Sequence, residues 1–338
     1  MTENNKDSGS VDVFGVGNAL VDILALVEDE FVIKHGLNRG GMTLMDSESQ
    51  GGILHDLEHT SLQLRSGGSA ANTMIAVAQS GGKAYYSGKV AKDTNGEFYR
   101  QDLLEAGIDF NVHPATEFNA PTGTCVVLTT PDAERTMCTN LGVSTTLAVT
   151  DINVDRLAHC KYSYIEGYLW DAPNPRKASI ETMEQSKRLG VKVAFTFSDC
   201  FLVHRFADDF HKVVSEYCDV IFCNSDEVRS FFQEESFEEC ARKMSEITDL
   251  AFITHGAKGC MVVENKQIVE VPGYPVHAID TVGAGDAFAG GVLFGLTNGL
   301  SAAQAARWGH LLASRVVQIH GPRLEGSQAH LLSQVIPG

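Results

Sequence analysis

Short apolar runs typical of β-strands alternate along most of this 338-residue chain with runs of helical periodicity. The strand-like runs lie at residues 11–17, 83–91, 161–169, 192–197, 218–223 and 250–256. Between the first two, residues 72–82 place Met74, Ile75 and Ala78 on one helical face, and a Gly-Gly pair ends that helix. This alternation predicts β-α-β units, and therefore an α/β fold with a mostly parallel sheet and helices on both faces.

Two polar pairs mark expected helix starts. Thr94 and Glu97 have the spacing of a capping box, in which each of the two side chains accepts a hydrogen bond from the backbone N–H of the other residue. Ser301 and Gln304 have the same spacing ahead of a long helical pattern over residues 301–318.

Two regions interrupt the strand-helix alternation. Residues 18–50 and 110–145 contain short runs rich in Thr, Val and Gly, which predict short strands and turns. We expect these regions to form a small, discontinuous β lid over the main sheet. Residues 11–338 are predicted to form one domain that includes this lid, and the polar residues 1–10 are expected to be disordered.

Charge and hydropathy exclude several classes of partner. The formal net charge of −17 repels polyanions, and no block of Lys and Arg reverses it locally, so nucleic acid is not expected as a partner. No membrane span is expected, because the chain lacks an apolar run long enough to cross a bilayer. The eight cysteines are scattered without a C-x-x-C pair and are predicted to be reduced thiols of a cytoplasmic protein. A monomer and a homodimer both stay open.

The segment DTVGAGDAF at residues 280–288 places three small residues between two acids, directly ahead of an apolar run. If that run is a helix, the N–H groups of Gly283, Ala284 and Gly285 are open to an anion. Asp286 could then take a proton from an incoming hydroxyl. Spacing alone favours a simpler interpretation, in which the glycines form a tight turn and the acid caps the helix.

Two familiar nucleotide-binding motifs are excluded. The segment GVGNAL at residues 15–20 begins like a dinucleotide fingerprint, but Leu20 replaces the third glycine and no acid-ended second strand follows. The Gly88-Lys89 pair lacks the earlier glycine of a Walker loop, and Val90 has no hydroxyl for a magnesium ion. Neither a Rossmann cofactor site nor a Walker-type phosphate loop is expected.

Five segments together resemble the ribokinase or PfkB family of carbohydrate kinases. They are SGGSAANTMIAVAQSGG, PTGTC, ERT, NSDE and DTVGAGDAFAGG, which occur in the family's order. Within the family, GNALVDI, PTGTC, YIEGYL and GHLLASRVVQIHG look most similar to the adenosine kinase branch. The resemblance covers residues 11–325. It implies a ribokinase-like α/β fold, with a mostly parallel sheet, helices on both faces and a small β lid.

The resemblance implies roles in phosphoryl transfer. Asp286 matches the base that deprotonates the acceptor hydroxyl, and the N–H groups of Gly283, Ala284 and Gly285 match an anion hole. Arg135 matches a lid arginine that reaches the transferred phosphate, although by itself it would be a solvated turn residue. The other matching segments favour the catalytic interpretation of Asp286 over helix capping.

The resemblance also implies an acceptor site. Asp22 matches an acid that binds two adjacent sugar hydroxyls, which suits a carboxylate because it can accept two hydrogen bonds. Further matches on the sugar side are Asn18, Gly67, Gly68 and Asn72. The matches beside the acceptor base are Cys125, Leu141 and Tyr168, where a tyrosine could face a purine. Without the resemblance, turn chemistry and ordinary core packing explain these residues.

On the nucleotide side, Asn224 and Glu227 match an N-x-x-E pattern that places magnesium and phosphate, with Glu227 acting through water. Alone, this pair could be a simple helix start. The remaining nucleotide-side matches are Thr254, Gly256, Gly259 and Asp280. Ser198 and Asp199 stand where many relatives have an asparagine, so their role stays open.

These observations predict an enzyme that transfers a phosphoryl group from ATP to an alcohol, with Mg²⁺ on the triphosphate. A K⁺ site near Asp280 and Val282 is an open addition. The favoured acceptor is the primary 5′-hydroxyl of a nucleoside, with adenosine giving AMP. One alternative is a ribokinase-like kinase of ribose, fructose or a related sugar. A more distant alternative is a catalytically silent nucleotide-binding regulator.

Overall fold

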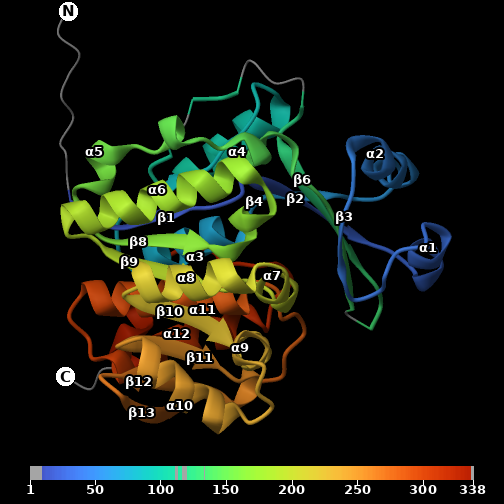
Figure 1. Ribbon diagram of the computed structural model, residues 1–338. Coiled ribbons are helices and arrows are strands. Elements are labelled where there is room, and N and C mark those ends of the chain that lie inside the picture. Colours follow the sequence, from blue (N-terminus) through green and yellow to red (C-terminus); the bar gives the residue numbers. More distant parts are fainter. Residues whose placement is uncertain (1–9, 111–112, 116–119, 133, 336–338) are drawn as a thin grey trace, which may run out of the picture.

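Eight strands form the central sheet of the computed structural model, which describes residues 10–110, 113–115, 120–132 and 134–335. Their order across the sheet is β13-β12-β11-β10-β9-β8-β1-β5 (Figure 1). The strands are β1 (Val11–Val16), β5 (Ala84–Ser87), β8 (Cys160–Glu166), β9 (Lys192–Thr196), β10 (Val220–Asn224), β11 (Leu250–Thr254), β12 (Gly259–Glu264) and β13 (Gln267–Pro272). All neighbours from β11 across to β5 are parallel, and β12 and β13 add an antiparallel edge. The predicted mostly parallel α/β sheet is confirmed.

Helices cover both faces of this sheet (Figure 1). One layer contains α3 (Ser69–Gln79), α4 (Thr94–Glu105), α11 (Ala284–Thr297) and α12 (Ala302–Val316). The other contains α5 (Val154–Leu157), α6 (Pro173–Leu189), α7 (Cys200–Arg205), α8 (Ala207–Glu216), α9 (Ser225–Phe232) and α10 (Phe237–Ile247). Successive side chains of a strand point to opposite faces, so Val220 and Phe222 pack in the first layer and Ile221 packs in the second. A strand buried on both faces needs a continuous apolar run, which is why the runs were readable in the sequence.

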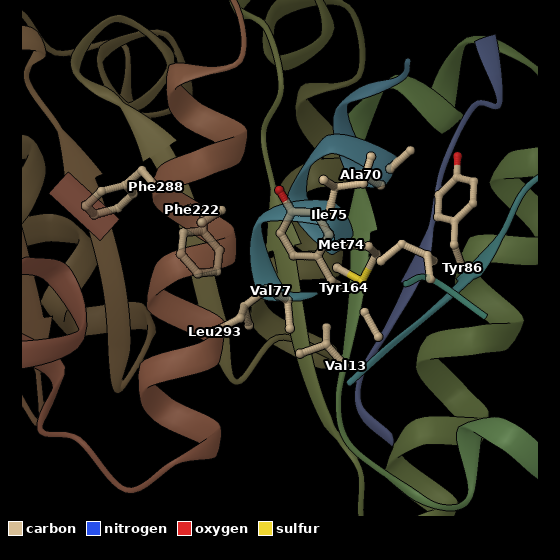
Figure 2. Packing of buried hydrophobic residues seen from close by; sticks show 14 of the residues in the cluster. Val13, Ala70, Met74, Ile75, Val77, Tyr86, Tyr164, Phe222, Phe288 and Leu293 are labelled. Carbon is tan, nitrogen blue, oxygen red and sulfur yellow. The ribbon is translucent and has the colours of Figure 1, made fainter. Parts of the chain in front are cut away.

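Close packing of α3 against α11 brings the first turns of these two helices together. In Figure 2, Met74 and Val77 of α3 lie beside Tyr164 of β8, and Leu293 of α11 packs in the same cluster. Small residues allow this approach: a Cβ atom at Gly290 would lie only 2.5 Å from the carbonyl oxygen of Thr73. Both helices begin at the same end of the sheet, where the cavity described below lies.

A second sheet of five strands, which we call the lid together with its two helices, projects from the central sheet (Figure 1). Its order is β3-β7-β6-β2-β4, with β2 (Leu20–Leu26), β3 (Met42–Leu44), β4 (Gln63–Gly67), β6 (Gly123–Thr129) and β7 (Arg135–Asn140). Four of these strands fall in the two regions expected to form the lid, whereas β4 lies outside both. Residues 1–10 were expected to be disordered, and residues 1–9 lie outside the described residues.

Two helices of the lid correct the expectation of only strands and turns at residues 18–50. They are α1 (Asp29–Lys34) and α2 (Ser47–Asp56). Helix α2 has little apolar periodicity, but Asp46 caps it by accepting a hydrogen bond from the Ser49 N–H at 2.8 Å. Its buried Gln50 donates to the carbonyl oxygens of Thr124 and Cys138 on the lid strands. Tertiary hydrogen bonds therefore stabilise a helix that the local pattern did not indicate.

The two predicted capping boxes have different outcomes. Ser301 and Gln304 form the expected box at the start of α12. At α4, however, the N-cap is Asp93, which accepts a hydrogen bond from the Gly96 N–H at 2.7 Å. The prediction of a Thr94–Glu97 capping box was therefore wrong. Asp93 also accepts from the Thr122 N–H at 2.8 Å, and this long-range contact fixes the register of the helix start.

The strand expected at residues 161–169 ends early. Strand β8 stops at Glu166, and a 3₁₀ turn, Gly167–Asp171, follows. Among the described residues, no helix is both long and apolar enough to cross a membrane. All eight cysteines are free thiols, as the sequence predicted.

Candidate active site

A cavity of about 990 Å³ lies where the carboxyl ends of the parallel strands face the lid. Its walls include Glu166 at the end of β8, Thr196 of β9, Asn224 of β10 and Thr254 of β11. The lid contributes Leu20, Asp22, Met42, Leu44, Cys125, Val127, Met137 and Thr139. Open α/β sheets bind ligands at this edge, because the strand ends and the starts of the following helices meet there.

Asp286 lies in the first turn of α11 and lines the cavity. Its carboxylate accepts hydrogen bonds from the Ser69 hydroxyl at 2.7 Å and from the Asn72 side-chain amide at 3.2 Å, both on α3. The N-cap of α11 is Gly283 rather than Asp286. Burial raises the pKa of Asp286 to about 6, and the two hydrogen bonds act in the opposite direction. A carboxylate with this pKa can accept a proton near neutral pH.

The start of α11 presents bare backbone to the cavity. Gly283 has a φ of 76°, and a Cβ atom there would lie 2.0 Å from the carbonyl oxygen of Pro322. A Cβ atom at Gly285 would have no neighbour within 4 Å, so this position is open, and both glycines line the cavity. Ala284 differs, because its N–H already donates to the Thr281 carbonyl oxygen at 3.3 Å. A phosphoryl group could therefore approach the first-turn N–H groups mainly beside the two glycines.

Four of the five residues expected on the sugar side line the cavity. They are Asn18, Asp22, Gly68 and Asn72. Gly68 has a φ of 94°, and a Cβ atom there would lie 2.1 Å from the Asn18 carbonyl oxygen. Gly67 does not line the cavity but lets Asp22 pack directly on its backbone, since a Cβ atom would lie 2.3 Å from the Asp22 carboxyl carbon. The glycine pair thus makes room for Asn18 of the β1–β2 connection and for Asp22 of β2.

Asp22 is a nearly buried acid. Burial raises its pKa to about 7, because removing a carboxylate from water disfavours the charged form. Among the charges around it, Arg323 lowers the pKa most, Asp286 raises it and Arg135 lowers it. The acid therefore titrates close to neutrality.

Arg135 begins β7 and contacts the loop that precedes α11. Its guanidinium forms a buried ion pair with Asp280, and neither residue lines the cavity. Asp280 also accepts hydrogen bonds from the Val282 N–H at 3.0 Å and the Gly321 N–H at 2.8 Å. Opposite charges attract strongly in such a water-poor setting, which explains why the arginine lies against the loop that precedes α11. Among the described residues, Nε and Nη1 of Arg135 have no hydrogen-bond partner.

Asn224 and Glu227 form a capping box at the start of α9. Asn224 accepts from the Glu227 N–H at 2.9 Å, while the two Glu227 oxygens accept from the Asn224 N–H at 3.0 Å and from its side-chain amide at 2.8 Å. Burial raises the pKa of Glu227 to about 7. Both residues line the cavity, but a metal would find these oxygens already engaged. Within the described ranges, no group of three or more His, Cys, Asp or Glu residues could hold a metal ion.

The other nucleotide-side residues separate into two groups. Thr254 and Gly256 line the cavity after β11. Gly259 does not, and its φ of 111° serves the turn into β12, where a Cβ atom would lie 2.1 Å from the Val271 carbonyl oxygen. Ser198, with a φ of 70°, lines the cavity and its hydroxyl accepts a hydrogen bond from the Gly167 N–H at 2.9 Å.

Cys125, Leu141 and Tyr168 all line the cavity. The Tyr168 hydroxyl donates to the Ser198 carbonyl oxygen at 3.2 Å, which orients the ring. The Cys125 sulfur accepts from the Thr139 hydroxyl at 3.3 Å, and burial raises the pKa of this thiol well above its ordinary value. The thiol is therefore neutral and acts as part of an apolar wall.

Two further residues, Ser69 and Glu166, belong to the site, although the sequence predicted no role for them. Ser69 holds Asp286, as described above. The carboxylate of Glu166, which is 1% exposed, accepts from the backbone N–H groups of Asn18 and Ala70, each at 2.7 Å. Burial raises the pKa of Glu166 to about 7. The available signal was an acid at the end of an apolar strand, because a buried acid requires partners.

Comparison with known proteins gives consistent results. A model described as the pfkB family carbohydrate kinase matches residues 48–328. The chain is 30% identical over 336 residues to adenosine kinase 2 of Arabidopsis thaliana, covering 91% of this chain and 94% of that protein. It is similar to the crystal structure of adenosine kinase from Sinorhizobium meliloti, with a TM-score of 0.89 and 34% identity over 97% of this chain and 100% of the other. It is similar as well to a probable sugar kinase from Rhizobium etli, with a TM-score of 0.90 and 33% identity over 97% and 99%.

Proposed function

We propose that this chain, which belongs to the pfkB family of carbohydrate kinases, transfers the γ-phosphoryl group of ATP to the 5′-hydroxyl of adenosine. Membership of the family and the similarity to adenosine kinases make it an ATP-dependent kinase with an alcohol acceptor. The observation that carries the proposal for this site is Asp286, which lies in the bare first turn of α11 and is held there by two side chains of α3.

In this reaction, the acceptor oxygen attacks the γ-phosphorus, and its proton passes to the carboxylate of Asp286. The bond between the γ-phosphorus and the bridging oxygen breaks, and ADP leaves with that oxygen. In this proposal, the backbone N–H groups at Gly283 and Gly285, two residues that line the cavity, stabilise the charge on the transferred group. Ser69 and Asn72 hold the Asp286 carboxylate in one orientation, so less conformational entropy is lost when it meets the attacking hydroxyl.

The register of the lid strands favours a nucleoside over a free sugar. Asp22 pairs across the sheet with Cys125, which pairs with Thr139, which pairs with Leu44. Cross-strand partners lie on the same face of a sheet. Asp22, the proposed acid for the sugar diol, therefore shares a face with Cys125, Thr139 and Leu44, which form a mainly apolar wall beside it. The next row adds Val127, Met137 and Met42, which also line the cavity. A base attached to the ribose would bury apolar area on this wall, and a free sugar would leave it uncovered.

The decisive measurement is ADP release with adenosine, other nucleosides, ribose and fructose as acceptors, at fixed ATP and Mg²⁺. We expect adenosine to have the highest kcat/KM. The variant Asp286→Asn tests the proposed base. It should lower kcat by at least about 100-fold, because it removes the general base. Wild-type turnover by Asp286→Asn would show that the base is wrongly assigned.

The sugar kinase alternative is supported by the similarity to the probable sugar kinase from Rhizobium etli. It would replace our proposal if ribose or fructose exceeded every nucleoside in kcat/KM. A catalytically silent regulator would instead bind ATP in a calorimeter and transfer phosphate to none of these acceptors.

The engaged oxygens of Glu227 fit an outer position better than direct coordination, so we propose that Glu227 contacts Mg²⁺ through water. The ion would neutralise charge on the triphosphate. A K⁺ requirement near Asp280 is a separate proposal, tested by replacing K⁺ with choline. Arg135 already neutralises that carboxylate, so we expect a modest effect.

The proposal extends to the remaining expectations. We propose that residues 11–338 act as one kinase domain in which the lid closes over the acceptor, and that the protein acts in the cytoplasm, where its eight free thiols stay reduced. Whether it is a monomer or a homodimer is a question for light scattering.

A further inference from the structure

Three consecutive residues after α12 contact both the loop before α11 and the lid strand β4. The Gly321 N–H donates to Asp280 at 2.8 Å, and the Pro322 carbonyl oxygen packs against Gly283. Arg323 then reaches the opposite side, toward the lid strand β4. The segment Gly321–Arg323 thus joins the loop before α11 to the strand that ends in the Gly67–Gly68 pair.

Arg323 fixes Ser66, the residue directly before that glycine pair. Its Nη1 donates to the Ser66 hydroxyl oxygen at 2.8 Å and to the Ser66 carbonyl oxygen at 3.2 Å. Its Nη2 forms an ion pair with Asp102 of α4. Asp102 in turn accepts from the Ser66 N–H at 2.8 Å and the Ser66 hydroxyl at 2.6 Å. Ser66 therefore has every polar group bonded to this pair of charges.

The charge of Arg323 also acts on Asp22. Burial raises the pKa of Asp22 to about 7, and Arg323 is the strongest of the charges that oppose this shift. Among the described residues, the other ionisable groups near Asp22 are Asp286 of α11, Arg135 of β7, Tyr99 of α4, Cys125 of β6 and Arg65, its cross-strand partner on β4. Of these, Arg135 adds to the effect of Arg323.

We propose that Arg323 is a positioning residue for the acceptor: through Ser66 it fixes the Gly67–Gly68 turn, and its charge favours the form of Asp22 that accepts two hydrogen bonds from a vicinal diol. Arg323 does not line the cavity, so it acts through these residues and not on substrate. The inference deepens the proposed function and rests on it.

The chain offers a matched control. Arg65 lies on β4, next to Ser66. It forms an ion pair at 3.1 Å with Glu325, which follows Arg323 closely in the sequence. That pair is exposed, with 39% and 82% of the side-chain surface accessible, whereas the Arg323 side chain is 11% exposed. Exposed pairs contribute little, so Arg65→Gln should behave like the wild type.

The test compares Arg323→Gln, Arg323→Lys and Arg65→Gln in steady-state kinetics, varying adenosine and ATP separately between pH 5.5 and 8.5. For Arg323→Gln we expect the KM for adenosine to rise about tenfold or more, because bonds to a charged group are lost. The KM for ATP should stay within about twofold. The acid limb of kcat/KM for adenosine should move to higher pH, since Asp22 loses its strongest stabilising charge. Arg323→Lys keeps the charge, so it should retain the wild-type acid limb while the KM still rises.

A second variant keeps the inference testable if Arg323→Gln does not fold. Asp102→Asn weakens the hold on Ser66 but leaves the Arg323 charge, so it should raise the KM for adenosine without moving the acid limb to higher pH. Calorimetric titration of adenosine should show the same loss of affinity as the kinetics. Equal changes in both KM values, or an Arg323→Gln profile that matches Arg65→Gln, would overturn the inference while leaving the proposed function intact. A wild-type protein without activity on any nucleoside or sugar would overturn both.

Discussion

Each acid of the cavity owes its behaviour to its own set of neighbours. Asp286, Asp22 and Glu166 are all carboxyls whose pKa burial raises to between about 6 and about 7. Their partners differ: Asp286 accepts from two side chains, whereas Glu166 accepts from two backbone N–H groups. A side chain that donates to the charged form lowers the pKa of the acid. Single substitutions should therefore move the pH profile in a direction that the hydrogen bonds fix.

The first prediction concerns the Ser69 hydroxyl, which donates a hydrogen bond to Asp286, the proposed base. In Ser69→Ala, Asp286 loses a 2.7 Å hydrogen bond that favours its ionised form, so its pKa should rise above about 6. The acid limb of kcat should move to higher pH, and the loss of kcat relative to wild type should be larger at pH 6 than at pH 8.5. Parallel pH profiles that differ by a constant factor would contradict this role for Ser69.

At the scale of elements, buried acids at strand ends connect segments that are distant in sequence. Glu166 at the end of β8 joins the β1–β2 connection to the first turn of α3 through the N–H groups of Asn18 and Ala70. Gly17 lies so close that a Cβ atom there would be 2.6 Å from a Glu166 oxygen. This part of the cavity wall is thus assembled around one carboxylate whose ionisation opposes folding.

The second prediction follows from the raised pKa of Glu166. Because the folded-state pKa of about 7 exceeds the unfolded value, this group stabilises the protein fully at low pH and loses that contribution as pH rises through about 7. The contribution is on the order of 3 kcal/mol. In Glu166→Gln, urea unfolding should show a smaller decrease in the free energy of unfolding between pH 5 and pH 8 than in wild type.

Glu166→Gln should also raise the KM for the acceptor about tenfold, since the amide would present a donor to one of the two N–H groups. The control is Glu264→Gln, a change at an exposed glutamate on β12, which should alter neither quantity. An unchanged pH dependence of stability in Glu166→Gln would show that another acid is responsible.

At the scale of the whole molecule, one ion pair connects the lid to the loop that precedes α11. Arg135 starts lid strand β7, and Asp280 lies in the loop before α11. Asp280 also holds the Val282 and Gly321 N–H groups, so the lid position and the loop conformation are coupled. Two guanidinium nitrogens of Arg135 are buried and have no hydrogen-bond partner within the described residues.

The third prediction tests this coupling. Arg135→Gln removes the charge that compensates buried Asp280, and we expect kcat to fall by about 10- to 100-fold with a smaller change in the KM for adenosine. Arg39→Gln is the matched control, because Arg39 is a lid arginine that is 40% exposed and pairs with Asp29 and Asp132 on the surface. Equal losses in both variants would mean that the lid needs positive charge in general and not this ion pair.

The sequence alone determined the α/β class, because strands buried on both faces require continuous apolar runs and their helices require apolar periodicity. It also determined the family, because DTVGAGDAF and the Gly67–Gly68 segment need small residues where backbone meets backbone or ligand. Tertiary structure decided what local patterns cannot encode. Helix α2 and the Asp93 cap depend on hydrogen bonds to residues about 30 to 90 positions away in the sequence. The contacts of Ser69, Glu166 and Arg323 span 96 to 257 residues, so only the folded chain brings these groups together.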